Sequence, residues 1–218
     1  MSRISFYHTT MSLDSILKAL QINTSDTILD VIGSSDTAHA MAEIARQIVS
    51  IDKLAGQADY ARLRQKKIKD GDFTGFLSVE QVADDFKFAL GRRNIYFLED
   101  GRLQRIADRA DAISFEQGDI FQVARANPGK FTKVNASNVF GYSRMHPRFY
   151  PERMADLANS LVKDGLLYVA DHNDMKTMAL RKGIGLVVSD SLQPDRELTA
   201  VAREHEHRIW SPVVYRKI

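Results

Sequence analysis

Apolar runs and amphipathic segments alternate along the first third of the chain. Two runs are continuous and bounded by turn residues, which is typical of strands buried on both faces. The segments between them carry apolar residues at helical spacing or are rich in helix-forming residues. The predicted elements are a helix over 13–20, a strand over 27–32, a helix over 38–46, a strand over 47–52 and a helix over 55–68. This alternation indicates a parallel sheet with right-handed crossovers.

The same alternation returns in the second half of the chain. The predicted elements there are strands over 112–117, 131–140, 165–170 and 209–216, a short extra strand over 184–189, and helices over 152–161 and 195–204. Together with the first half, they give seven strands that alternate with helices. The sequence therefore predicts an α/β fold, a three-layer sandwich with a mostly parallel seven-stranded sheet and one helical insertion.

The insertion occupies residues 70–110 and interrupts the alternation. We expect a turn with aromatic side chains over 70–76, a helix over 78–90 that ends at residues 91–94, and a second helix over 100–109. A long insertion between a helix and the next strand is typically a lid or a substrate-side subdomain. A rigid helical pair that packs on the sheet is the alternative.

Composition favours an ordinary globular protein. The 218 residues are 44% hydrophobic and 27% charged, which suffices for a core. We expect an N-terminal helical cover over 1–25 and one domain over 26–218 that carries the insertion as a lid. No run approaches the ~20 apolar residues of a membrane span, and the N-terminal residues do not resemble a secretory signal.

Cysteine and charge content narrow the chemistry. The absence of cysteine excludes disulfides, thiolate metal sites and cysteine nucleophiles, and it favours a cytoplasmic location. The 30 basic and 28 acidic residues give a net charge of +2 with no basic run. We therefore expect no nucleic acid as a partner, and a small-molecule or lipid-like one instead.

Polar residues gather where successive predicted strands end. In open α/β sheets, ligands bind at the carboxyl ends of the strands. A small first loop lets backbone amides approach a ligand, an acid after the second strand suits ribose hydroxyls, and an acid after the third suits an adenine amine. The candidate cofactor-binding residues are Ile32, Gly33, Ser34, Asp36, Asp52, Lys53, Asp119, Ile120, Ser137 and Asn138. The alternative is that Asp52 and Asp119 merely terminate strands.

These stretches resemble the class I S-adenosylmethionine-dependent methyltransferases. The matching pieces lie at residues 27–33, 49–52, 113–120, 134–139 and 161–170, so the likeness runs from about residue 26 to the C-terminus. The Gln-Gly-Asp-Ile and Lys-Asp-Gly-Leu-Leu stretches are its most specific parts. The resemblance implies a Rossmann-like fold, and S-adenosylmethionine as the cofactor.

The first loop departs from the family pattern. Members usually have Gly-x-Gly there, whereas this chain has Gly33-Ser34-Ser35-Asp36-Thr37. The serine-rich loop, the helical insertion and the C-terminal stretch from Pro194 are similar to one branch in particular. That branch transfers the 3-amino-3-carboxypropyl group of S-adenosylmethionine to diacylglycerol in betaine-lipid synthesis. This chain is shorter than typical members and would hold only the core.

The resemblance leaves more than one reaction open. S-adenosylmethionine is a sulfonium with three electrophilic carbons, so the protein needs no nucleophile of its own. Methyl transfer to a small-molecule or lipid-like acceptor is the expected reaction. The alternative is attack on the aminocarboxypropyl carbon, by an acceptor or by the cofactor's own amine in a cyclisation, with release of methylthioadenosine. A non-catalytic cofactor-binding module is the second alternative.

The candidate substrate residues are Tyr142, His146, Tyr96 and Tyr7. The first two lie in a locally basic stretch after a strand end, which suits an anionic substrate but is also typical of a solvated loop. A nicotinamide cofactor would need Gly-x-Gly-x-x-Gly, of which only Gly33 is present. No metal is expected at residues 204–207, because the two histidines are two residues apart rather than four.

Overall fold

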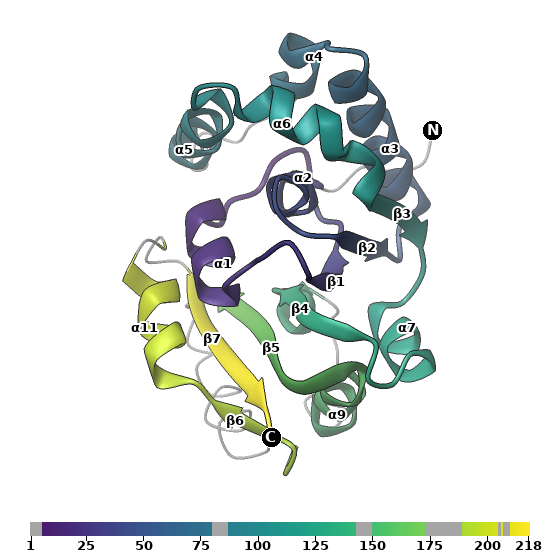
Figure 1. Cartoon of the computed structure of the whole chain (residues 1–218), viewed down its shortest axis with the longest axis vertical. Coiled ribbons are helices and arrows are strands. Elements are labelled where there is room, and N and C mark those ends of the chain that lie inside the picture. Colours follow the sequence, from purple (N-terminus) through teal and green to yellow (C-terminus); the bar gives the residue numbers. More distant parts are fainter. Residues whose placement is uncertain (1–5, 80–86, 143–149, 173–188, 205, 207–209) are drawn as a thin grey trace.

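A seven-stranded sheet forms the centre of the protein (Figure 1). The computed structural model describes residues 6–79, 87–142, 150–172, 189–204, 206 and 210–218. The sheet has the order β3-β2-β1-β4-β5-β7-β6. Its strands are β1 (Thr27–Val31), β2 (Gln47–Asp52), β3 (Ile113–Gln117), β4 (Phe131–Ser137), β5 (Leu161–His172), β6 (Leu192–Pro194) and β7 (Trp210–Lys217). All neighbouring strands are parallel except that β7 runs antiparallel to β5 and β6, so the predicted sheet is confirmed.

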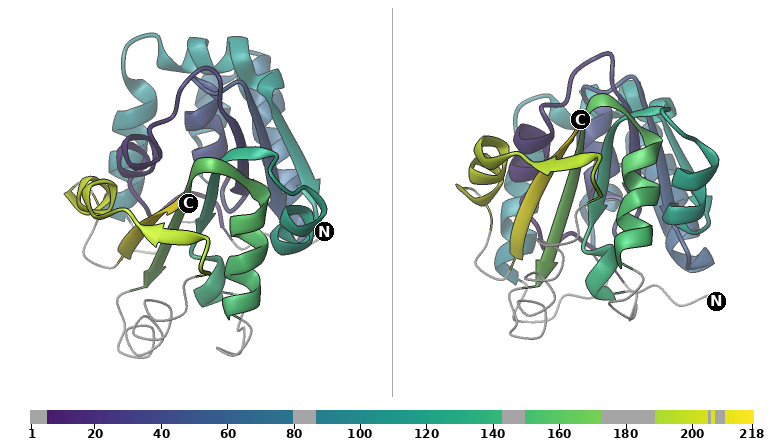
Figure 2. Two further views of the ribbon diagram at one scale, coloured as in Figure 1. Left: turned by 60° about the horizontal axis from the view of Figure 1, so that its bottom comes forward. Right: turned by 90° about the horizontal axis from the view of Figure 1, so that it is seen from below.

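Helices cover both faces of the sheet and make the predicted three-layer sandwich (Figure 2). One face carries α1 (Leu13–Leu20), α2 (Asp36–Ala42), α3 (Ala55–Lys69) and α11 (Arg196–Glu204). The other face carries α7 (Ile120–Ala126), α8 (Val139–Tyr142) and α9 (Tyr150–Ser160). With both faces covered, the central strands carry apolar residues toward both sides: Ile28 faces the α2 side, and Leu29 faces the α7 side.

The first helix is part of this sandwich. The Ser12 hydroxyl caps α1 by accepting a hydrogen bond from the Ser15 N–H at 3.2 Å. The apolar stripe of α1, including Ile16 and Leu20, packs on Tyr168 of β5 and on α11. The predicted helix is therefore confirmed. That residues 1–25 act as a cover over a site stays a prediction.

The insertion folds as α4 (Phe73–Leu77), α5 (Lys87–Leu98), α6 (Arg102–Arg109) and the 3₁₀ turn η2 (Ala110–Ala112). These elements pack outside α2 and α3 (Figure 1). Phe76 and Phe97 are fully buried there, with ring centroids 5.3 Å apart at 89°. The insertion thus has an apolar core of its own, and its closure over a ligand stays a prediction.

Two expectations within the insertion are wrong. The turn over 70–76 contains the helix α4, because the Asp72 carboxylate accepts a hydrogen bond from the Gly75 N–H at 2.8 Å and caps it. The helix expected to end at 91–94 instead continues as α5 to Leu98, since Arg93 and Phe97 gain buried contacts that outweigh the low helix propensity of Gly91. Residues 80–86 lie outside the described residues.

The remaining differences between the predicted and the observed elements concern where strands begin and end, and two short elements that were not predicted. β4 stops at Ser137, earlier than predicted, and α8 follows it. β5 begins at Leu161, earlier than predicted, and contains a register shift against β4 with Asp164 at φ 62°. The sequence pattern missed α7 and the three-residue β6. The extra strand over 184–189 lies almost wholly outside the described residues.

A buried polar group lies in the middle of the sheet. Asp30 of β1 accepts hydrogen bonds from the Ser50 hydroxyl of β2 at 2.6 Å and from the Asn135 amide of β4 at 2.7 Å. Asn135 in turn accepts a hydrogen bond from the Ser137 N–H at 3.2 Å. Burial raises the pKa of Asp30 to about 7, despite the lowering effect of these two donors.

Asp30→Asn should remove a pH dependence of stability. The native carboxyl keeps its proton up to about pH 7, whereas in the unfolded chain it ionises near its ordinary value of 3.8, so folding becomes less favourable as pH rises between them. Asn can accept from Asn135 and donate to Ser50. Between pH 5 and 8, urea denaturation should show wild type losing about 3 kcal/mol more than Asp30→Asn. Equal losses would contradict the raised pKa.

Candidate functional site

The loops that follow β1, β2, β3 and β4 lie at one edge of the sheet, because these four strands are parallel. The structure therefore brings together the polar residues predicted at the strand ends. Contacts among them follow the strand order: the loop after β1 contacts the end of β2, and the end of β2 contacts the loop after β3.

Asp52 closes β2 and is partly exposed. Its carboxylate accepts a hydrogen bond from the Leu54 N–H at 2.9 Å, and the backbone N–H groups of Gly33 and Lys53 also donate to it. Burial raises the pKa of Asp52, while these donors favour its charged form. The carboxylate is thus held by backbone amides directly beside the first loop.

Asp119 lies next to Asp52 after β3. One oxygen of its carboxylate caps α7 by accepting from the Phe121 N–H at 2.9 Å. The other pairs with the Lys53 ammonium at 3.1 Å, and the Gly118 N–H donates to the Asp52 carbonyl at 2.8 Å. These contacts join the two acids into one cluster, which a ligand could span. Ile120, the candidate that follows Asp119, is the first residue of α7, and its side chain is buried in the core.

The end of β4 supplies Ser137 and Asn138. Ser137 has a left-handed backbone with φ 46°, which turns the chain out of the strand. Its hydroxyl lies 3.4 Å from the Asn138 side-chain oxygen and 3.7 Å from the sulfur of Met11. The N-terminal segment therefore reaches this edge of the sheet.

The loop after β1 differs from the other three because its side chains turn inward. Ile32, Ser34 and Asp36 are buried, whereas Gly33 is partly exposed, with φ +45° and no heavy atom within 4 Å of the place a Cβ would take. The backbone at Gly33 is thus the part of this loop that a ligand can approach most closely.

The sequence predicts that Asp36 contacts a cofactor, whereas in the structure both carboxylate oxygens bind protein groups. One oxygen pairs with the guanidinium groups of Arg64 and Arg93, each at 2.8 Å. The other accepts from the Thr9 N–H at 2.8 Å and from the Ser34 hydroxyl at 2.9 Å. Burial alone would raise the pKa of Asp36, but the two guanidinium groups lower it well below its usual range.

Sequence reasoning missed Arg64 and Arg93, which lie on α3 and α5 and are both almost fully buried. Arginine on a charged helix usually faces solvent, so nothing in the pattern marks these two. The Arg64 guanidinium also donates to the Ser34 carbonyl at 2.6 Å and stacks on Phe76, with its carbon 4.3 Å from the ring centroid. The resulting ion cluster fixes the first loop in place.

The candidate substrate residues do not converge. Tyr7 packs edge-to-face on Tyr60 of α3 at 5.6 Å, near the strand ends. Tyr96 lines a cavity of about 640 Å³ between the start of α1 and α5. Only the backbone of Tyr142 is described, at the end of α8, and His146 lies outside the described residues.

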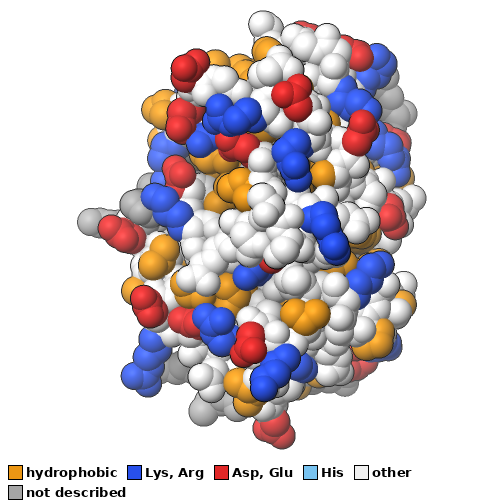
Figure 3. Space-filling model, viewed as in Figure 1, with side chains coloured by type: hydrophobic (Ala, Val, Ile, Leu, Met, Phe, Trp, Pro, Cys, Tyr) orange, Lys and Arg blue, Asp and Glu red, His pale blue; other side chains and the backbone are white. Residues whose placement is uncertain are grey.

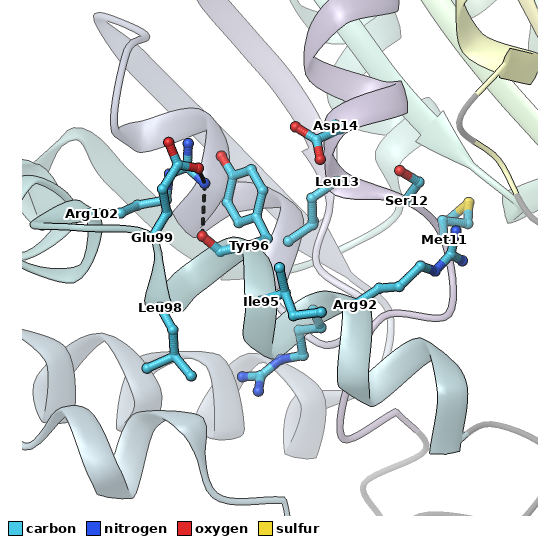
Figure 4. Close-up of a pocket in the computed structure, with 11 residues that line it drawn as sticks. Met11, Ser12, Leu13, Asp14, Arg92, Ile95, Tyr96, Leu98, Glu99 and Arg102 are labelled. Atoms are coloured by element: carbon cyan, nitrogen blue, oxygen red, sulfur yellow. Dashed lines mark hydrogen bonds and ion pairs between the residues drawn. The ribbon is translucent and has the colours of Figure 1, made fainter.

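The cavity beside Tyr96 is separate from the strand ends. Figure 4 shows the Tyr96 ring between Leu13 of α1 and Arg102. Its hydroxyl has no hydrogen-bond partner among the described residues, and burial raises its pKa. Met11 and Arg93 also line this cavity, and both touch the candidate site, through Ser137 and Asp36.

The surface seen in the view of Figure 1 carries acidic and basic side chains intermingled (Figure 3). None of the helices in the described ranges is long and apolar enough to cross a membrane. Within the same ranges, no group of three or more histidine, aspartate or glutamate side chains is placed to hold a metal ion. His205 and His207 of the stretch considered above lie outside those ranges.

No family model matches the sequence, and no curated protein matches it at a significant level. Solved structures are similar to it. An S-adenosylmethionine-dependent methyltransferase from Aquifex aeolicus has a TM-score of 0.57 and 10% identity, over 96% of this chain and 91% of that one. An rRNA methylase from Streptococcus thermophilus has a TM-score of 0.52 and 9% identity, over 94% and 93%.

Two further neighbours complete the comparison. The N-methyltransferase NodS from Bradyrhizobium japonicum, solved with S-adenosyl-L-homocysteine, has a TM-score of 0.52 and 12% identity, over 93% of this chain and 83% of that one. The YcgJ protein from Bacillus subtilis, at a TM-score of 0.47 and 15% identity, matches 79% of this chain but only 55% of its own. The methyltransferases from Aquifex aeolicus and Bradyrhizobium japonicum and the rRNA methylase, all with TM-scores above 0.5, show that the protein has their Rossmann-like fold, as predicted.

Gly33→Ala should destabilise the protein. An alanine at φ +45° meets no clash but is strained by its backbone, which costs about 1 kcal/mol. Gly91→Ala is the matched control, because Gly91 lies inside α5 with open space around it and should gain about 0.5–1 kcal/mol. Urea denaturation of both variants checks the pair. A Gly33→Ala variant as stable as wild type would contradict the left-handed conformation.

Proposed function

We propose that the protein is an S-adenosylmethionine-dependent transferase that transfers the methyl group to a small-molecule or lipid-like acceptor. The observation that carries this proposal lies at the carboxyl edge of the sheet, where the Gly33 N–H donates to Asp52 and the neighbouring Lys53 pairs with Asp119. Two carboxylates on adjacent strand ends, beside an open backbone, suit a ligand with a ribose and an adenine. The likeness of the fold to methyltransferases supports the same cofactor.

The residues at the edge fit the nucleoside part of this cofactor. Asp52 is partly exposed and is oriented by its amide donors, so it would accept hydrogen bonds from the two ribose hydroxyls. Asp119 would accept from the adenine amine, with Lys53 as its counter-ion. The open side of Gly33 leaves room for the chain that joins the nucleoside to its sulfur.

The amino acid end of the cofactor would meet different groups. Because Ser34 and Asp36 face inward, the first loop offers only backbone near Gly33. Ser137 and Asn138 at the end of β4 provide a hydroxyl and an amide on the other side of the edge. We propose that these two residues orient the reacting end.

Bound S-adenosylmethionine supplies an electrophilic carbon, so this chain needs to bind the cofactor, orient it toward the acceptor and exclude water. Asp52 and Asp119 would fix the nucleoside, while the segment around Thr9 and Met11 lies over the first loop and the end of β4. No catalytic base is assigned. Alignment of an acceptor atom with the carbon–sulfur bond is sufficient for this class of reaction.

The neighbours do not select the acceptor, since one of them is named as an rRNA methylase and another as an N-methyltransferase. The near balance of 30 basic and 28 acidic residues supports a small molecule rather than RNA. A second candidate is transfer or cyclisation of the aminocarboxypropyl group. It is favoured by the first loop, whose inward-facing Ser34 and Asp36 change the surroundings of the amino acid end.

One experiment distinguishes these reactions. The protein is incubated with S-adenosylmethionine and a cell extract, and the nucleoside product is identified by mass spectrometry. S-adenosylhomocysteine is the product expected from methyl transfer, and methylthioadenosine would indicate aminocarboxypropyl chemistry instead. If neither forms while calorimetry shows binding, the protein is a cofactor-binding module; absence of binding overturns the proposal.

Asp52→Ala should weaken S-adenosylhomocysteine binding on the order of tenfold to a hundredfold. The variant loses hydrogen bonds from ribose hydroxyls to a carboxylate, together worth ~1.5–3 kcal/mol. Asp111→Ala is the matched control, since Asp111 is exposed and precedes β3 at the opposite edge of the sheet. Calorimetry on folded variants measures both. Equal affinities for Asp52→Ala and Asp111→Ala would remove Asp52 from the site.

Asp119→Ala should lower the affinity for adenosyl ligands in general, because its proposed partner is the adenine amine. Adenosine and S-adenosylhomocysteine should lose affinity by similar factors in calorimetric titrations. A loss confined to S-adenosylhomocysteine would show that Asp119 does not face the adenine. Because Asp119 also caps α7, thermal unfolding of the variant should be recorded beside the titrations.

A further inference from the structure

The segment before α1, residues 6–12, passes the strand ends without forming a helix or a strand, and we refer to it as the N-terminal strap. At its start, the Phe6 backbone forms two hydrogen bonds with the Gln57 amide of α3, at 2.6 and 3.2 Å. At its end, the Ser12 N–H donates to the Glu206 carboxylate, at 3.0 and 3.2 Å. Between these two points the strap passes the first loop and the end of β4.

The central attachment of the strap is the hydrogen bond from the Thr9 N–H to Asp36, at 2.8 Å. Both groups are buried, and the acceptor is a charged carboxylate, so this is the strongest kind of hydrogen bond the strap makes. The nearby contact of the Met11 sulfur with the Ser137 hydroxyl, at 3.7 Å, is weak by comparison.

Asp36 is itself held in place by two arginine side chains. Arg64 and Arg93 fix one of its oxygens, and three of their Nη atoms donate to the carbonyls of Ser34, Phe76 and Leu77. The second oxygen therefore points in a fixed direction, toward Thr9 and Ser34. An acceptor this well oriented sets the position of the strap above the first loop.

We propose that Asp36 is a positioning residue, which attaches the N-terminal strap over the amino acid end of the adenosyl ligand without touching that ligand. This inference rests on the proposed function. The strap lies over the first loop and Ser137, where the amino acid end is proposed to sit, whereas Asp52 and Asp119 hold the nucleoside end. Loosening the strap should therefore weaken the binding of ligands that carry the amino acid chain more than the binding of ligands that lack it.

Thr9→Pro tests the attachment directly, because proline has no N–H while the Asp36–Arg64–Arg93 cluster stays intact. Thr9→Val controls for the hydroxyl, which accepts a hydrogen bond from the Met11 N–H at 3.2 Å. Thr10→Pro controls for the stiffness of proline, since the Thr10 N–H makes no hydrogen bond within the described part of the chain. All three changes leave the sheet and helices untouched.

The first measurement is hydrogen exchange of the ligand-free protein. In Thr9→Pro, the amides of the strap that bond to groups outside it, such as Phe6 and Ser12, should exchange about tenfold faster, while the sheet is unchanged. Thr9→Val and Thr10→Pro should stay within about threefold of wild type. Equal exchange in Thr9→Pro and wild type, or equal acceleration in Thr10→Pro, would overturn the proposal. This arm needs no ligand, so it stands even if the proposed function fails.

The second measurement is calorimetric binding of S-adenosylhomocysteine and adenosine. Thr9→Pro should bind S-adenosylhomocysteine about tenfold more weakly and adenosine within about twofold of wild type. Equal weakening of both ligands would show that the strap does not lie over the amino acid end. Failure of wild type to bind either ligand would overturn the proposed function instead, and the exchange result would still report on the attachment.

Discussion

A buried carboxylate keeps its charge at low cost only where cations and hydrogen-bond donors surround it, and Asp36 meets that condition with groups from distant parts of the chain. Arg64 lies on α3, Arg93 lies on α5 of the insertion, and the Thr9 N–H belongs to the N-terminal strap. Removing one member of such a cluster typically costs ~3–5 kcal/mol. The first loop, the insertion and the strap therefore depend on one another for their positions.

This dependence divides the edge of the sheet into two parts. After β2 and β3, Asp52 and Asp119 stay partly exposed and are held by backbone amides and Lys53. After β1, the loop is closed by its own ion cluster, and only the backbone at Gly33 is open. A loop of the Gly-x-Gly kind offers bare backbone to a ligand. In this chain the buried side chains of the loop and the strap leave only the backbone at Gly33 open.

The strands were predictable because both faces of the sheet are covered, so that in residues 47–52 the consecutive Ile48 and Val49 pack on opposite faces. The positions of Asp52 and Asp119 followed from the strand ends. The helix after Asp119 did not, because a capping aspartate and a turn aspartate look alike in a sequence. The inward direction of Arg64 and Arg93 could not be predicted from the sequence either, because it depends on Asp36, which the fold brings close from a distant part of the chain.

The ion cluster also has a consequence for how the chain can diverge. Loss of Asp36 would leave two buried guanidinium groups without their counter-ion, whereas replacement of all three side chains by apolar ones of similar volume can be neutral. Among related chains, the aspartate should therefore be lost only together with the two buried arginines.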